Sequence, residues 1–138
     1  MSYKINSVLI IDDDEISNFI TESILEQSGK VKNVNIEMSA DEGLTYLSKV
    51  AKKNLANTPT LVLLDIKMPV KSGWDFLNEL RDLQELKGND MIIVMLSSSV
   101  YPDDVHKANN YSEVAGYLSK PITLEKVDEI IEKYIPKQ

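Results

Sequence analysis

The chain has 138 residues, the length of one ordinary domain, and 43% of them are hydrophobic, which is enough to bury a core. Its formal charge of −7 and its lack of cysteine disfavour a nucleic-acid partner and exclude disulfides and thiolate metal sites. Because it also has no apolar signal segment and no membrane-length apolar run, we expect a cytoplasmic protein.

Five short apolar runs, rich in Val, Ile, Leu and Met, predict β-strands. They are Val8–Ile11, Val34–Met38, Leu61–Leu64, Met91–Leu96 and Val114–Leu118. Three of the five are apolar almost throughout, which is typical of strands that are covered on both faces of a sheet.

The first predicted helix follows the first strand. Ile16, Phe19, Ile20 and Ile24 recur at helical spacing and predict a helix. Gly29 offers a C-terminal stop, because glycine adopts the left-handed conformation that ends many helices.

Four more helices are predicted between or after the remaining strands. Ser39–Glu42 has the S-x-x-E form of a capping box and begins the second helix. The third begins near Gly73, the fourth occupies 102–111, and the fifth begins at Leu124 with Thr123 as its N-cap. The alternation of strands and helices predicts an α/β domain, residues 1–138, with a doubly wound parallel sheet.

Polar residues follow four of the predicted strands. They are Asp12, Asp13 and Asp14 after the first, Asp65 after the third, Ser97, Ser98 and Ser99 after the fourth, and Ser119 and Lys120 after the fifth. Ligands of open parallel sheets bind at the carboxyl ends of the strands, so we expect these groups to converge at one edge.

These residue types suit the chemistry of phosphate. Asp12, Asp13 and Asp65 can hold Mg²⁺, which prefers oxygen ligands, and an aspartate can accept a phosphoryl group as an acyl phosphate. Lys120 can neutralise the phosphoryl oxygens, and the Ser97 hydroxyl can donate a hydrogen bond to one of them.

The motifs VLIIDDD, LVLLDIKMPVKSGW, VMLSS and GYLSKP, one at each of four strand ends, resemble those of the receiver domain of two-component response regulators. The sequence is similar to the stand-alone chemotaxis regulators over almost its whole length. The resemblance implies a flavodoxin-like fold of five strands in the order 2-1-3-4-5, with the site between strands one and three.

The resemblance also implies roles for the acidic residues. Asp65 corresponds to the phosphoacceptor, and Asp12 and Asp13 correspond to the acidic pair, with Asp13 as the more direct Mg²⁺ ligand. The backbone carbonyl of Lys67 would complete the protein ligands of the metal.

Further positions correspond to the catalytic and switch residues of the family. Ser97 takes the hydroxyl position, where threonine is more frequent, and Lys120 takes the position of the lysine. Pro121 follows in what the family makes a cis peptide, and Tyr117 matches the aromatic switch position. In the implied mechanism, phosphorylated Asp65 draws Ser97 and Lys120 inward, and the loop after strand four follows.

The implied function is that of a signalling domain rather than an enzyme, although it can promote its own phosphorylation and dephosphorylation. A sensor histidine kinase or a histidine phosphotransfer protein donates the phosphoryl group in a Mg²⁺-dependent reaction. The changed surface of helix four, strand five and helix five then binds a downstream protein. The resemblance implies a monomer or a phosphorylation-dependent dimer, without nucleic acid or membrane contact.

Two alternatives remain at this point. The run IIDDDE partly resembles the motif of haloacid dehalogenase-type phosphatases, with Asp12 as nucleophile and Asp14 as acid/base. Against it, Glu15 replaces the expected Thr or Val, a cap domain is not apparent, and DIKMP has no explanation. The other alternative is a pseudo-receiver that binds a partner without phosphorylation, although such domains usually lack a residue of the acidic pair, the acceptor or the lysine.

Overall fold

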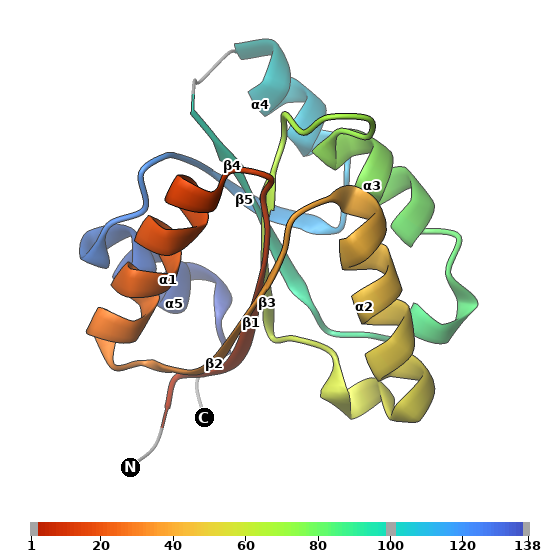
Figure 1. Cartoon of the computed structure of the whole chain (residues 1–138), viewed down its shortest axis with the longest axis horizontal. Coiled ribbons are helices and arrows are strands. Elements are labelled where there is room, and N and C mark those ends of the chain that lie inside the picture. The colour runs from red at the N-terminus through yellow and green to blue at the C-terminus, as the bar shows by residue number, and fades with distance from the viewer. Residues whose placement is uncertain (1–2, 99–101, 137–138) are drawn as a thin grey trace.

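The computed structural model describes residues 3–98 and 102–136. Its five strands form one parallel sheet in the order β2-β1-β3-β4-β5, so the predicted fold class and strand order are confirmed (Figure 1). The strands are β1 (Ile5–Ile11), β2 (Val31–Glu37), β3 (Leu61–Asp65), β4 (Ile92–Ser97) and β5 (Val114–Ser119). Ser99 and the loop predicted to move lie outside the described ranges.

Helices cover both faces of this sheet (Figure 1). They are α1 (Glu15–Ser28), α2 (Ala40–Lys53), α3 (Gly73–Leu80), α4 (Pro102–Asn109) and α5 (Leu124–Tyr134), with two short 3-10 helices at Leu55–Asn57 and Gln84–Leu86. The pair α1 and α5 covers one face, and α2 and α3 cover the other. No helix in the described ranges is long and apolar enough to cross a membrane.

The core consists of two apolar layers, one on each face of the sheet. Along β1, Leu9 and Ile11 belong to the layer under α2 and α3, whereas Val8 and Ile10 belong to the layer under α1 and α5. Successive side chains of a strand point to opposite faces, so a strand covered on both sides is apolar at every position. All five residues of β3 are buried for this reason.

Two strands are longer at their start than the apolar runs predicted. β1 begins at Ile5 rather than Val8, and β2 begins at Val31 rather than Val34. Ile5 pairs with Val31, so the intervening polar residues are held in the sheet by pairing of the backbone. Hydrophobicity alone does not detect such residues.

The ends of the strands also differ from the prediction. Met38 and Met91 lie outside β2 and β4, whereas Asp65, Ser97 and Ser119 are the last residues of β3, β4 and β5. Because these polar residues still belong to strands, the regular geometry of the sheet determines their positions.

Local hydrogen bonds define the helix ends. Gly29 ends α1 with a φ of 69°, and Ser39 and Thr123 accept backbone N–H groups as the N-caps of α2 and α5, as predicted. A reciprocal capping box that the sequence analysis did not predict begins α3. There the Ser72 hydroxyl accepts the Asp75 N–H, and the Asp75 carboxylate accepts the Ser72 N–H.

The helix predicted from Ile16, Phe19, Ile20 and Ile24 is confirmed as α1, but of these four residues only Ile24 packs against the core. Ile16, Phe19 and Ile20 are 73%, 69% and 41% exposed, and the buried residues of this helix are Asn18, Thr21 and Leu25, listed from its start. Helical periodicity identifies a stripe but does not say which stripe faces the sheet. In α1 the face that carries Asn18 is turned inward, and the Asn18 side-chain amide donates a hydrogen bond to the Asp12 backbone carbonyl.

This orientation of α1 predicts how two substitutions in the helix affect stability. We expect Phe19→Ser to change the free energy of unfolding by less than about 0.5 kcal/mol, because an exposed side chain loses few contacts. Leu25→Ala should cost about 2 to 5 kcal/mol, because Leu25 is fully buried. Urea denaturation measures the free energy of unfolding of both variants. A larger loss for Phe19→Ser than for Leu25→Ala would contradict this orientation of α1.

Candidate functional site

Three carboxylates converge at the carboxyl ends of β1 and β3. One oxygen each of Asp12, Asp13 and Asp65 lies within 4.8 Å of the other two. Asp12 and Asp65 are only 1% and 6% exposed, and Asp13 is half-buried. Such a concentration of negative charge away from water requires compensating positive charge or hydrogen-bond donors.

The sheet and the start of α3 hold Asp65 in place. β1 and β3 are neighbours, and Ile11 pairs with Leu64, so the residues that follow the pair lie side by side. A Cβ atom on Gly73 would lie 2.6 Å from the Asp65 carbonyl oxygen, so only glycine allows α3 to begin so close to the strand. The Gly73 N–H also donates to the Ile66 carbonyl at 2.8 Å.

Lys120 supplies the positive charge. Its Nζ lies 2.6 Å from Asp12 Oδ2 and 3.3 Å from Asp65 Oδ1. Its backbone N–H donates to the Ser97 carbonyl at 2.7 Å, and the peptide bond between Lys120 and Pro121 is cis. The lysine therefore connects the ends of β1, β3 and β5.

The first turns of α1 supply further donors. Asp12 Oδ1 accepts the Asp14 N–H at 3.0 Å, and Oδ2 accepts the Ser17 hydroxyl at 2.9 Å. The Asn18 amide donates to the Asp12 backbone carbonyl at 2.9 Å. The sequence did not single out Ser17 and Asn18, because the type and spacing of polar residues at a helix start do not show what they contact.

Burial and charge perturb the two central groups. Desolvation, together with the charges of Asp12 and Asp13, raises the pKa of Asp65 to about 6, although Lys120 opposes the shift. Burial lowers the pKa of Lys120, but its contacts with Asp12 and Asp65 outweigh burial and the pKa is raised. Lys120 therefore remains charged while Asp65 titrates near neutrality.

The remaining predicted residues lie around this centre. Ser97 is 3% exposed at the end of β4, the strand next to β3, and Asp65 pairs with Leu96. Tyr117 is half-buried and packs against the layer under α2 and α3. Lys67 is exposed, two residues beyond Asp65.

The donor set of the acidic cluster fits Mg²⁺. It consists of carboxylate oxygens at the end of the sheet, without sulfur or imidazole. Mg²⁺ is usually held by one or two carboxylates plus phosphate oxygens and water, and the three carboxylates of this cluster are sufficient for that. A divalent cation would also reduce the repulsion among the three carboxylates.

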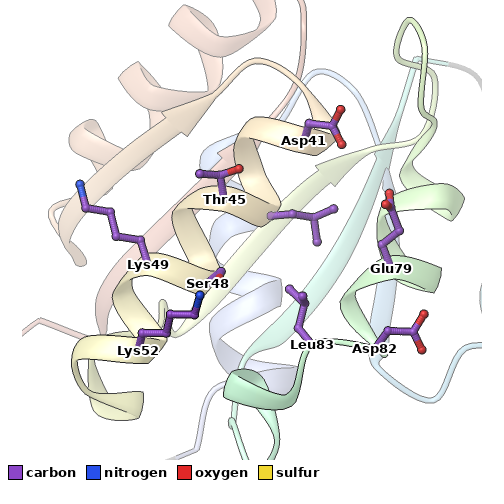
Figure 2. Close-up of a pocket in the computed structure, with 9 residues that line it drawn as sticks. Asp41, Thr45, Ser48, Lys49, Lys52, Glu79, Asp82 and Leu83 are labelled. Atoms are coloured by element: carbon purple, nitrogen blue, oxygen red, sulfur yellow. The ribbon is translucent and has the colours of Figure 1, made fainter.

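A separate groove of about 820 Å³ lies between α2 and α3. Figure 2 shows Asp41 and Lys49 on α2 and Glu79 on α3 around it. Lys71 joins the two helices by ion pairs to Asp41 at 2.7 Å and to Glu79 at 3.0 Å. No residue that lines the groove belongs to the acidic cluster of Asp12, Asp13 and Asp65. Among the described residues the groove is therefore distinct from the site.

Comparison with known proteins agrees with the fold. Residues 8–132 match the response regulator receiver domain. A two-component response regulator from Cytophaga hutchinsonii has a structure with a TM-score of 0.86 and 30% identity, over 94% of this chain and 96% of that one. Two-component response regulator ORR41 of Oryza sativa subsp. japonica is 29% identical over 134 residues, 97% of this chain and 98% of that protein.

Longer relatives contain a region similar to the whole of this domain. Peroxide stress-activated histidine kinase mak1 of Schizosaccharomyces pombe is 33% identical over 127 residues, which are 91% of this chain but 7% of that protein. Response regulator Rre1 of Synechocystis is 27% identical over 96% of this chain and 52% of its own length. The chain therefore spans only part of the length of several relatives.

The chain belongs to the response regulator receiver domain family. Receiver domains are signalling domains rather than classical enzymes, and they interact with histidine kinases or phosphotransfer proteins. They bind Mg²⁺ in an acidic pocket, and the cluster at Asp12, Asp13 and Asp65 has the composition of such a pocket.

The raised pKa of Asp65 predicts a pH-dependent loss of stability in the metal-free protein. Between its ordinary pKa of 3.8 and about 6, the folded protein retains a proton that the unfolded chain has lost. The free energy of unfolding therefore falls as the pH rises through this range. Asp65→Asn should raise it at pH 7.5 by about 1 to 3 kcal/mol, and the gain should disappear towards pH 4.

Urea denaturation in a metal chelator, at a series of pH values, measures this difference. Asp82→Asn, at an exposed aspartate, is the matched control for the loss of one negative charge. Equal effects of the two substitutions would contradict a special electrostatic environment for Asp65.

Proposed function

We propose that this chain is a phosphoaccepting switch that takes a phosphoryl group on Asp65 from a sensor histidine kinase or a histidine phosphotransfer protein. The observation that carries the proposal is the position of Lys120 Nζ, 2.6 Å from Asp12 Oδ2 and 3.3 Å from Asp65 Oδ1, beside three clustered carboxylates. A cation next to clustered acids matches the needs of phosphoryl transfer, which depends on positioning and charge neutralisation.

The proposed reaction forms an acyl phosphate. A carboxylate oxygen of Asp65 attacks the phosphorus of a phosphohistidine, the P–N bond breaks, and the donor imidazole leaves with the bonding electron pair and takes up a proton. Asp12, Asp13, Asp65 and the carbonyl of Lys67 would hold Mg²⁺, which would supply positive charge to the phosphoryl oxygens. Lys120 neutralises another phosphoryl oxygen.

The proposed switch follows from the new negative charge on Asp65. The Ser97 hydroxyl and Lys120 turn towards the phosphoryl group, and Tyr117 turns into the space that this vacates. The surface of α4, β5 and α5 changes, and a downstream protein binds the changed surface. In this proposal residues 1–138 act as one receiver domain in the cytoplasm, as a monomer or a phosphorylation-dependent dimer, without nucleic acid or membrane contact.

The exposed face of α1 is consistent with a protein as donor. Ile16 lies two residues after Asp14, so this apolar face begins beside the acidic cluster. Ile16, Phe19 and Ile20 together form an exposed apolar patch on a domain that is otherwise well packed. Such patches often mark protein interaction sites.

Intact-mass analysis after incubation with acetyl phosphate tests the proposal. We expect the wild-type protein to gain one phosphoryl group in the presence of Mg²⁺ and much less in a chelator. Asp65→Asn should abolish the gain, because it removes the acceptor carboxylate.

Asp12→Asn distinguishes the proposed reaction from chemistry at Asp12. This variant should be phosphorylated more weakly, yet still at Asp65, because it weakens metal binding and leaves the acceptor intact. A phosphoryl group that persists in Asp65→Asn and is lost in Asp12→Asn would instead indicate a dehalogenase-type nucleophile. A wild-type protein that gains no mass would indicate a binding module that works without phosphorylation.

A further inference from the structure

Asp12 is held by groups from two separate parts of the fold. Lys120, after β5, and Ser17, in the first turn of α1, both donate to Oδ2, at 2.6 Å and 2.9 Å. Oδ1 accepts the Asp14 N–H. With 1% exposure, the Asp12 side chain depends on these donors rather than on water.

The two hydrogen bonds to Asp12 Oδ2 differ in whether they persist when Asp65 is phosphorylated. Lys120 Nζ is also 3.3 Å from Asp65 Oδ1, so it lies between the two carboxylates. When Asp65 carries a phosphoryl group, as in the proposed function on which this inference rests, Lys120 donates to that group. Ser17 belongs to a helix and stays beside Asp12.

Asn18 acts on the same loop through the backbone. It is 4% exposed, and its amide donates to the Asp12 carbonyl at 2.9 Å. Ser17 and Asn18 are adjacent in α1, so one helix turn holds both the side chain and the main chain of Asp12. This arrangement determines the position from which the next residue, Asp13, extends.

We propose that Ser17, assisted by Asn18, is a positioning residue of the metal and phosphoryl site. Its hydroxyl keeps the Asp12 carboxylate in the acidic cluster after Lys120 has turned to the phosphoryl group. The Ser17 hydroxyl donates to Asp12 Oδ2 at 2.9 Å, so Ser17 acts through Asp12. Hydrogen-bond partners of ligating carboxylates orient those ligands, and their loss typically weakens metal binding by about 10-fold or more.

Titration calorimetry with MgCl₂ alone tests the proposal on the unphosphorylated chain. Ser17→Ala should raise the dissociation constant of Mg²⁺ by about 10-fold. Ser17→Thr should restore it to within about twofold of the wild-type value, since it keeps the hydroxyl. Ser23→Ala, the same change six residues further along α1, is the matched control and should have no effect.

Two further measurements separate positioning from a general structural role. In a chelator, Ser17→Ala should keep a cooperative urea transition with only a modestly lower midpoint, because it removes one hydrogen bond to Asp12, and Ser17→Thr should keep the wild-type midpoint. The Mg²⁺ concentration that gives half-maximal phosphorylation by acetyl phosphate should rise by about the same factor as the dissociation constant.

Several results would overturn the proposal. An unchanged Mg²⁺ affinity in Ser17→Ala would show that the hydroxyl does not position Asp12. A weaker affinity that Ser17→Thr does not restore, or the loss of a cooperative urea transition in Ser17→Ala, would assign Ser17 a structural role. Failure of the wild-type chain to bind Mg²⁺ or to be phosphorylated would reject the proposed function, and this inference with it.

Discussion

The repulsion among three carboxylates at one edge of the sheet is the constraint on which the site depends. Asp12, Asp13 and Asp65 come together because β1 and β3 are parallel neighbours that end at the same level. Burial strengthens the repulsion by removing water. The fold offsets it with the ammonium of Lys120 and with hydrogen bonds from the start of α1.

The compensation is incomplete, and this has chemical consequences. Asp65 retains a raised pKa despite the nearby lysine, so the metal-free site favours any species that brings positive charge. In the proposed function a divalent cation meets that need, so that a phosphoryl group is accepted where its anionic oxygens would otherwise be repelled. Lys120 contacts both carboxylates, so a change at Asp65 alters its bond to Asp12 as well.

Much of the site could be predicted because its residues follow strands. In a parallel sheet every carboxyl end points the same way, so Asp12, Asp65 and Lys120 had to meet at one edge once the strands were recognised. The strand limits were less predictable. The polar residues between Ile5 and Val8 belong to β1 through backbone pairing with β2, which leaves little trace in hydrophobicity.

The sequence by itself determined the α/β class, the order of the elements and the edge of the sheet where the acids gather. These depend on local apolar periodicity and on the direction of parallel strands. Only the tertiary structure decided the rotation of α1, which exposes Phe19 and buries Asn18 against the Asp12 loop. Periodicity gives the spacing of the apolar residues along a helix but not which face of the helix packs on the sheet, because long-range contacts in the folded protein decide that face.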